Sequence, residues 1–345
     1  MRRGIAVAAA LAAIGLAAPG LAQTVEVTAA GETTPVGTAN DDAADDPAIW
    51  RNARRPAASL IVATDKKAGL YVYGLDGQVR HFEPAGRLNN VDLIDLGRRG
   101  IWVVASDRND EANAILRLYR LDGQTGKLAP AGSAPGGAGE AYGVCLMRSG
   151  RDIHAFSVLK HGAIHQVRLD IGGAEPTGTL VRSYALETQT EGCVVDERTA
   201  TLYVGEEDRG IWAFDLRQPG QTAGKLVAAV DGVQLVADVE GLAIAPRGRN
   251  GGWLVASSQG DNAYALYRLP DMAPAGRFRI AAGDFGATEE TDGIALALGS
   301  FGAKYPQGLF VAQDGDNAPA AQNFKLVSWR AVLDALKKAD KQSAR

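Results

Sequence analysis

The chain has 345 residues, of which 46% are hydrophobic, and a formal net charge of −4. Its 42 glycines and only three methionines suit many short strands joined by turns, whereas a helical protein would show a sustained 3.6-residue periodicity. The negative balance, without a basic stripe or regularly spaced aromatics, argues against nucleic acid as a partner.

The first residues have the features of an export signal. Met1, Arg2 and Arg3 precede an apolar run from Ile5 to Ala18, and a small-residue cleavage site follows. The run is too short and too rich in alanine for a permanent membrane span. We therefore predict a signal peptide at 1–22, cleaved after Ala22, and a periplasmic or secreted mature protein with no membrane partner.

Residues 23–40 form a polar N-terminal segment, and part of it is expected to pair as an outer strand that closes a ring. The rest of the chain, 41–345, is expected to be one domain. Within it a short pattern recurs six times, mostly an acidic residue before a short apolar strand. The six openings are Asp46-Pro-Ala-Ile-Trp, Asp92-Leu-Ile-Asp-Leu, Ala141-Tyr-Gly-Val-Cys, Glu191-Gly-Cys-Val-Val, Glu240-Gly-Leu-Ala-Ile and Asp292-Gly-Ile-Ala-Leu.

Each opening is followed by two more strand-like runs in the same order, bounded by turn residues. The second runs begin at Leu60, Trp102, His154, Leu202, Trp253 and Leu309, and the third at Leu70, Ile115, Ile164, Ile211, Tyr264 and Phe324. A period of roughly 40 to 55 residues with three or four strands is typical of propeller blades. The sequence predicts an all-β, six-bladed β-propeller of mostly four-stranded antiparallel blades, with a short C-terminal helix from Trp329 to Lys338.

Charged residues cluster at equivalent strand ends. Because second strands run opposite to first strands, their ends lie on the face where the acidic openings begin. That face should gather the acids Asp45, Asp46, Asp92, Glu191, Glu207, Asp238, Glu240, Asp292 and Asp314 and the bases Lys66, Lys67, Arg108 and Lys160. So many carboxylates in one concave site repel one another and attract cations.

Oxygen ligands at irregular spacing suit calcium, which takes six to eight oxygens in flexible geometry. Zinc prefers sulfur or imidazole, and the pair His161 and His165 lacks the further ligands of a zinc site. For any single acid, a solvated rim or a turn is an equally ordinary role. Six acids in register favour a metal site, and the adjacent bases favour an anionic ligand.

Cys145 and Cys193 lie in the first strands of two different blades, in apolar surroundings. Pairing is open to them in an exported protein, but cysteine is also common as a small buried hydrophobe. The apolar surroundings favour unpaired, buried thiols.

An ordered set of motifs spans nearly the whole mature chain. It comprises Asp45-Asp-Pro-Ala-Ile-Trp, Lys66-Lys-Ala-Gly-Leu, Leu88-Asn-Asn-Val-Asp, Gln189-Thr-Glu-Gly, Glu206-Glu-Asp, Asp238-Val-Glu-Gly-Leu, Ala256-Ser-Ser-Gln-Gly, Thr291-Asp-Gly-Ile and Tyr305-Pro-Gln-Gly-Leu-Phe-Val-Ala-Gln-Asp-Gly. In this order the set resembles the β-propeller (alkaline) phytases. The resemblance implies a calcium-dependent enzyme that removes phosphates from myo-inositol hexakisphosphate (phytate). We expect the protein to be a monomer.

The resemblance also implies roles for individual residues. Several calcium ions would be held by Asp46, Glu191, Glu207, Asp238, Glu240 and Asp292, and a structural calcium by Asp314. The cleaved phosphate would be bound by the catalytic residues Lys66, Arg108, Tyr142 and Lys160, beside Glu207. Lys67, Asn90 and His161 would contact substrate. His161 departs from the family pattern, which often has an acid there, and the segment 283–290 is less acidic than usual.

The implied chemistry is in-line attack of a calcium-activated water, with the bases neutralising the phosphate oxygens. Two alternatives stay open at this point. A calcium-dependent propeller lactonase or organophosphate hydrolase would share the acid-lined channel but have little need for the bases. A non-catalytic binding propeller would use calcium for stability alone.

Overall fold

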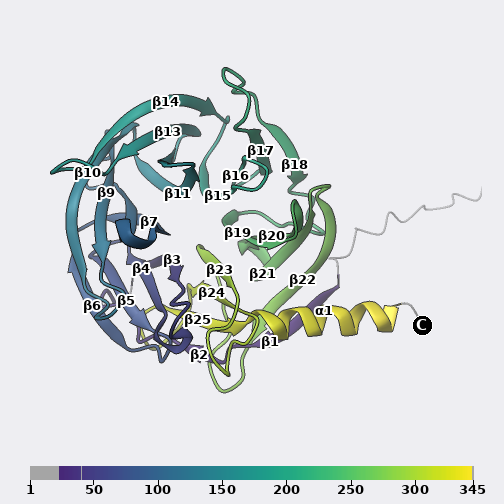
Figure 1. Ribbon diagram of the computed structural model, residues 1–345. Helices are drawn as coiled ribbons and strands as arrows, with labels where there is room; N and C mark the ends of the chain where they lie inside the picture. The colour runs from purple at the N-terminus through teal and green to yellow at the C-terminus, as the bar shows by residue number, and fades with distance from the viewer. Residues whose placement is uncertain (1–22, 40, 344–345) are drawn as a thin grey trace, which may run out of the picture.

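The computed structural model describes residues 23–39 and 41–343, so the signal peptide predicted at 1–22 lies outside the described residues. Six sheets stand around a central axis, each presenting its first strand to the axis and its last to the outside (Figure 1). The prediction of a six-bladed β-propeller with four-stranded antiparallel blades is confirmed.

The strands of the blades follow one another in chain order. Blade 1 contains β3 (Ala44–Trp50), β4 (Leu60–Asp65), β5 (Gly69–Gly74) and β6 (Val79–Pro84). Blade 2 contains β7 (Leu88–Asp95), β8 (Ile101–Asp107), β9 (Asn113–Leu121) and β10 (Leu128–Ala138). Blade 3 contains β11 (Ala141–Ser149), β12 (Asp152–Leu159), β13 (Ala163–Asp170) and β14 (Thr177–Ala185).

The second half repeats the arrangement. Blade 4 contains β15 (Thr190–Asp196), β16 (Thr201–Glu206), β17 (Gly210–Asp215) and β18 (Lys225–Ala229). Blade 5 contains β19 (Val239–Arg247), β20 (Gly251–Ser258), β21 (Ala263–Leu269) and β22 (Ala273–Ala281). Blade 6 contains β23 (Ile294–Leu298), β24 (Gly308–Asp314) and β25 (Asn323–Ser328).

The N-terminal segment completes the last two blades. β2 (Gly31–Glu32) pairs antiparallel with β25 and supplies the fourth strand of blade 6, as expected for a ring-closing strand. β1 (Thr24–Thr28) pairs in parallel with β22, which makes blade 5 five-stranded. The two ends of the chain thus meet in neighbouring blades, and β2 closes the ring by completing blade 6.

The core lies between adjacent blades, and the C-terminal helix seals part of it. α1 (Trp329–Ser343) begins where predicted and runs five residues further. Trp329 and Val332 are buried in the cluster between blades 5 and 6, and Leu333 and Leu336 pack against that cluster. Among the described residues, no helix is both long and apolar enough to cross a membrane.

The two cysteines form a disulfide between blades 3 and 4, Cys145–Cys193, with a Cα–Cα distance of 5.7 Å. The interpretation of both as unpaired buried thiols was therefore wrong. The reason is geometric: β11 and β15 are neighbouring inner strands of the ring, so residues 48 apart in sequence come into contact. The bond links two blades close to the axis.

Candidate active site

The predicted site residues lie at the start of the inner strands, where five blades share one irregularity. The pairing of β3, β7, β11, β15 and β19 with their second strands shifts register within the first few residues. A β-bulge at such a point twists the strand and redirects its side chains. The shifts fall between Ala44 and Pro47 in blade 1 and between Thr190 and Cys193 in blade 4, so Asp45, Asp46 and Glu191 lie within them. Asp92 lies beyond the shift of blade 2, which falls between Leu88 and Val91.

Glycine after the acid lets the inner strands approach one another. A Cβ at Gly192 would lie 2.1 Å from the carbonyl oxygen of Glu240, and one at Gly293 would lie 2.4 Å from Asp46 Oδ1. No side chain fits at such distances, so the acid-glycine pairs allow neighbouring openings to touch. The recurrent sequence pattern is therefore what brings distant carboxylates together.

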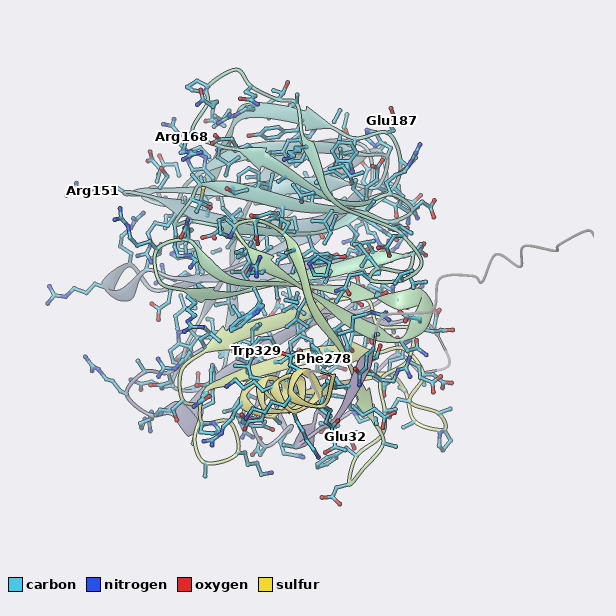
Figure 2. All side chains as sticks on the ribbon, turned by 90° about the vertical axis from the view of Figure 1, so that its right-hand side faces the viewer. Glu32, Arg151, Arg168, Glu187, Phe278 and Trp329 are labelled. Carbon is cyan, nitrogen blue, oxygen red and sulfur yellow. A yellow bond between two sulfur atoms is a disulfide. The ribbon has the colours of Figure 1, made fainter. Side chains whose placement is uncertain are left out.

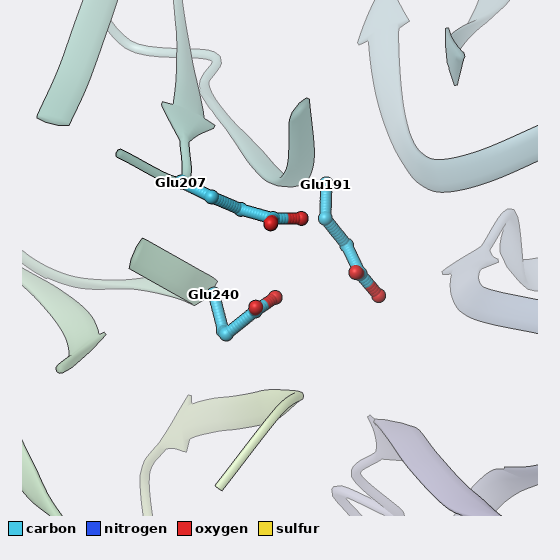
Figure 3. Close-up of side chains that lie close together, drawn as sticks. All are labelled: Glu191, Glu207 and Glu240. Carbon is cyan, nitrogen blue, oxygen red and sulfur yellow. The ribbon is translucent and has the colours of Figure 1, made fainter. Parts of the chain in front are cut away.

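Three glutamates from blades 4 and 5 point toward one another near the axis (Figure 3). Carboxylate oxygens of Glu191, Glu207 and Glu240 all lie within 4.8 Å of one another, and all three residues are buried. Glu191 and Glu240 open inner strands, whereas Glu207 follows the second strand β16. We call these residues the glutamate cluster.

A buried lysine lies beside the glutamate cluster. The Lys66 ammonium is 2.8 Å from Asp42 Oδ2, 3.1 Å from Asp292 Oδ2 and 3.7 Å from Asp45 Oδ1. Asp292 also accepts a hydrogen bond of 2.7 Å from Gln259 Nε2. Lys66 is thus the cation of the chain itself that compensates the acids of blades 1 and 6.

Two further cations lie close to the ring of Tyr142. The Arg108 guanidinium lies 5.6 Å and the Lys160 ammonium 5.0 Å from the centre of the Tyr142 ring. Both cations face Glu140, at 3.2 Å from Arg108 and 4.0 Å from Lys160. The structure therefore brings the predicted residues Lys66, Arg108, Tyr142 and Lys160 to the same face as the glutamate cluster.

The other acids predicted for this face take different positions. Asp46 Oδ2 accepts a hydrogen bond of 3.0 Å from the backbone N–H of Val91 in the next blade. Asp92 makes a similar contact with the following blade, where it accepts a hydrogen bond of 2.7 Å from the backbone N–H of Leu146. Both line the axial cavity below the glutamate cluster and join neighbouring blades. Asp238 is half-buried in the segment before β19.

The predicted substrate-contacting residues are spread around the rim. The Lys67 ammonium lies 3.5 Å from Asp41 and is well exposed. Asn90 is buried at the opening of β7, with its N–H bonded to Ser106 Oγ at 2.9 Å. His161 is exposed, next to Gly139. Of the three, Asn90 lies nearest the axis, lining the axial cavity with Asp46.

Burial and mutual repulsion change the pKa values of these acids. Burial raises the pKa of Asp45 and of Glu207 to about 7, and that of Glu191 and of Asp292 to about 8. Burial, with the neighbouring charge of Glu191, places the pKa of Glu240 well above its ordinary value. Carboxylates with raised pKa values are unfavourable as anions without a further cation.

These pKa values predict a pH effect on the metal-free protein. Because the folded acids retain protons that the unfolded chain has released, the folded state binds more protons between about pH 4 and pH 8, so its stability falls as pH rises through that window. With a chelator present, we expect a lower melting temperature at pH 8 than at pH 5. In excess calcium this difference should shrink or reverse, since metal binding needs ionised carboxylates. A metal-free melting temperature that rose with pH would contradict the proposed repulsion.

The donor set fits a hard divalent cation. Buried oxygens of Asp45, Glu207 and Glu240 accept no hydrogen bond within the described structure, although buried polar atoms are almost always partnered. The residues offer carboxylate and amide oxygens, with no histidine or thiol among them. Such a set is suited to calcium rather than zinc.

Asp314 lies apart from this site, in a pocket already neutralised by a lysine. The fully buried Lys325 ammonium is 2.9 Å from Asp314 Oδ2 and 2.7 Å from Glu32 Oε2. It also donates to Asn323 Oδ1 at 2.9 Å and Asn317 Oδ1 at 3.2 Å. These four oxygens already surround the Lys325 ammonium and would not hold a metal ion in addition to it. Asp314 is therefore not included in the ligand set proposed below.

We expect Lys325→Met to destabilise the fold by about 3–5 kcal/mol, because Asp314 would be left as a buried charge without its partner. Denaturant unfolding with a chelator present measures this loss. The double variant Lys325→Met/Asp314→Leu should recover most of it. An unchanged single variant would show that the ion pair is dispensable.

Sequence reasoning missed several polar partners of the site. Asn89 donates to Glu191 Oε1 at 2.8 Å, and Gln189 donates to the Tyr142 hydroxyl at 3.3 Å. Both lie inside motifs whose other members had been assigned. Glu140 was missed because the third opening was placed at Ala141. Its position as an acid directly before that strand was the signal that could have identified it.

Comparisons with known proteins find similarity over nearly the whole chain. The family model described as Phytase matches residues 3–343. The 3-phytase of Bacillus subtilis (strain 168) is 40% identical over 329 residues, covering 90% of this chain and 85% of the relative. A chain of the "Crystal Structure of Mitotic Checkpoint Complex" has a TM-score of 0.51 at 15% identity, covering 94% of this chain and 87% of that one. That last likeness shows the propeller fold alone.

Fold, site and sequence relatives together define a β-propeller phosphoric monoester hydrolase, which rules against the alternative of a non-catalytic propeller. The chain belongs to the phytase family.

Proposed function

We propose that the chain is a calcium-dependent phytase that hydrolyses phosphomonoesters of myo-inositol hexakisphosphate. The observation that carries the proposal is the glutamate cluster, three buried carboxylates within 4.8 Å of one another, beside Lys66, Arg108 and Lys160. A site for a polyanion needs a cation to make such acids compatible with phosphate.

The ligand set we propose consists of Glu191, Glu207 and Glu240, with Asp45 and Asp292 adjacent. Asp46 and Asp238, which the family resemblance assigns as calcium ligands, remain predicted ligands of the site. Calcium bound there would supply a water of lowered pKa as nucleophile and would neutralise phosphate charge. All ligands must be ionised to bind it, so activity should favour neutral to alkaline pH.

The residues of the chain have separate tasks in this proposal. Arg108 and Lys160 bind oxygens of the phosphate being cleaved, and the Tyr142 ring holds both cations in place. The Arg108 Nε is buried with no hydrogen-bond partner among the described residues. Lys66 contributes a third positive charge at the edge of the cluster. Asn89 keeps Glu191 oriented.

Phosphate release from phytate tests the proposal. We expect release with calcium present, loss after chelation, and recovery when calcium is returned. The same preparation should leave lactones and aryl phosphotriesters intact, which separates a phytase from a propeller lactonase or organophosphate hydrolase. Full phytate hydrolysis by thoroughly chelated protein would overturn the calcium requirement.

Glu140 should compete with phosphate for the two cations. Its carboxylate faces both Arg108 and Lys160, and a like charge near a bound phosphate costs on the order of 1–4 kcal/mol. We therefore expect Glu140→Gln to strengthen inhibition by inorganic phosphate about tenfold. Weaker inhibition, with a reduced kcat, would show that Glu140 serves instead to orient Arg108.

We further propose that the protein is exported to the periplasm or secreted. The sequence of residues 1–22 supports this, and so does the disulfide between Cys145 and Cys193, since such bonds persist in oxidising compartments. N-terminal sequencing of the exported protein should start at Gln23.

A further inference from the structure

The hairpins between first and second strands all lie on the face opposite the site. Each inner strand begins at the site and ends on this face, which we call the hairpin face. An axial cavity of about 410 Å³ connects the two, with Asp46 and Asn90 lining one end and Glu197 and Arg198 the other. In the side view, Arg151 of the hairpin face and Glu187 of the site face lie on opposite sides of the molecule (Figure 2).

The hairpin face is rich in arginine. The basic residues at the ends of the inner strands and in the hairpins are Arg51, Arg54, Arg55, Arg98, Arg99, Arg148, Arg151, Arg198, Arg247, Arg249 and Lys304. The acids in the same segments are Asp95, Asp152, Asp196 and Glu197. Hairpins from all six blades contribute a base, although the whole chain carries a net charge of −4. Positive charge is therefore concentrated in the inner hairpins of this face, near the axis. The outer hairpins of the same face, between third and fourth strands, carry the acids Asp76, Asp122, Asp170, Glu175, Asp215 and Asp271.

Most of this positive charge is not neutralised by the protein. Arg198 is bonded to Asp196, and Arg51 and Arg99 donate to backbone carbonyls. Among the described residues, seven exposed arginines of the hairpin face make no ion pair: Arg54, Arg55, Arg98, Arg148, Arg151, Arg247 and Arg249. In the outer hairpins of the same face, between third and fourth strands, exposed arginines such as Arg80 and Arg268 are paired with Asp76 and Asp271.

We infer that the hairpin face is a docking surface for an anionic lipid surface. The unpaired arginines come from four separate blades around the ring, a distribution that complements a broad sheet of phosphate headgroups rather than one convergent phosphate. A surface hollow of about 860 Å³ between blades 1 and 2 has room for a headgroup. It is lined by Arg51, Arg54 and Arg55, and also by the acids Asp95 and Asp122. Arginine can lay its stem along lipid while the guanidinium stays at the headgroups.

The mode of attachment follows from what the hairpin face lacks. The exposed large hydrophobic side chains, Val79, Leu180, Val181 and Leu226, belong to the outer strands β6, β14 and β18 and not to the hairpins. Attachment would therefore be electrostatic, reversible and sensitive to salt. Docking by this face would leave the mouth of the site open to soluble substrate. The inference modifies the expectation that the mature protein has no membrane partner, which rested on the lack of a membrane-spanning run and on cleavage of the signal peptide.

Co-sedimentation with lipid vesicles tests the inference, with a chelator present so that calcium cannot bridge protein and lipid. At low salt the purified chain should bind phosphatidylcholine vesicles that contain about one third phosphatidylglycerol, and should not bind pure phosphatidylcholine. Binding should disappear at about 0.5 M salt. Failure to bind the anionic vesicles would overturn the proposal.

A variant and a charge-matched control locate the surface. Arg54→Ser/Arg55→Ser/Arg98→Ser/Arg151→Ser should lower vesicle partitioning by roughly fivefold per arginine, or several hundred-fold together. Arg87→Ser/Arg209→Ser/Lys337→Ser/Lys338→Ser removes the same charge from other faces and should change partitioning by less than about twofold per residue. Unchanged phosphate release from phytate in solution confirms that the first variant is folded.

Three results would contradict the assignment. Equal loss in the two variants would mean that overall charge, and not the hairpin face, governs binding. Displacement by millimolar inorganic phosphate would indicate a small-anion site. Tighter binding to duplex DNA than to anionic vesicles of equal phosphate content would assign the face to nucleic acid.

Discussion

Replacing Glu240 with glutamine is expected to lower calcium-dependent phosphate release from phytate by roughly 10³-fold and, in the same protein, to raise the melting temperature of the metal-free form. Glutamine keeps the shape of the side chain but removes one of three buried charges. In the metal-free protein this relieves repulsion, because Glu191, Asp292 and Glu207 all raise the pKa of Glu240 after burial has done so. With calcium, the same change removes a ligand.

The opposite effects, lower phosphate release and a higher metal-free melting temperature, distinguish a metal site from an ordinary structural contact. Loss of a stabilising contact would lower both activity and the metal-free melting temperature. Glu187→Gln is the matched control, because Glu187 is exposed on the same face outside the glutamate cluster and should change neither quantity. A Glu240→Gln protein that kept its activity, or that melted lower without metal, would contradict the proposed role.

Replacing Arg108 with lysine is expected to reduce kcat/KM for phytate by roughly 10²-fold, although the charge is retained. The Arg108 side chain is largely buried, and its guanidinium lies 5.6 Å from the centre of the Tyr142 ring and 3.2 Å from Glu140, so its planar donors are held in one orientation. Lysine offers a single ammonium that cannot reproduce the two-pronged contact. Arg108→Ala should reduce kcat/KM for phytate still further.

Two readouts separate this role from a general effect. Calcium binding by Arg108→Lys should stay as in the parent protein, because no atom of Arg108 belongs to the ligand set. Arg87→Lys, an exposed arginine paired with Glu111, provides the matched control and should retain full activity. If Arg108→Lys were as active as the parent, the phosphate would have to be held elsewhere.

The architecture followed from the sequence because each blade repeats its own local signals. Short apolar runs at Leu60, Trp102 and Trp253 became the second strands β4, β8 and β20, within two residues of the predicted starts. The acid-glycine openings predicted the convergence at the axis, because equivalent positions in a closed ring must face one another. These features depend on repetition, which a single sequence displays directly.

Other features depend on which blades are neighbours and could not be read from local pattern. Cys145 and Cys193 bond only because β11 and β15 are adjacent at the axis. Lys325 lies in an apolar strand, where a single lysine ordinarily faces solvent, yet it is fully buried among oxygens from β2, β24 and a nearby loop. The parallel pairing of β1 with β22 likewise had no signal in the chain.

The candidate site was predicted in its acids and bases but not in their exact partners. Glu191, Glu207 and Glu240 converge, while Asp46 and Asp92, which have the same pattern of acid before an apolar strand, bind backbone N–H groups of the next blade. The sequence pattern predicts the same role for the acids that converge and for those that bind backbone N–H groups. The difference lies in register: Glu191 and Glu240 are the first residues inside the shifts of their strands, whereas Asp46 is the second residue inside its shift and Asp92 follows the shift of β7.

Anomalous diffraction from a crystal soaked in calcium tests the central claim most directly. We predict a strong peak between the carboxylates of Glu191, Glu207 and Glu240, and its disappearance in crystals of Glu240→Gln. Density that showed these three side chains with no ion between them, in a crystal whose protein hydrolyses phytate in the same solution, would contradict it.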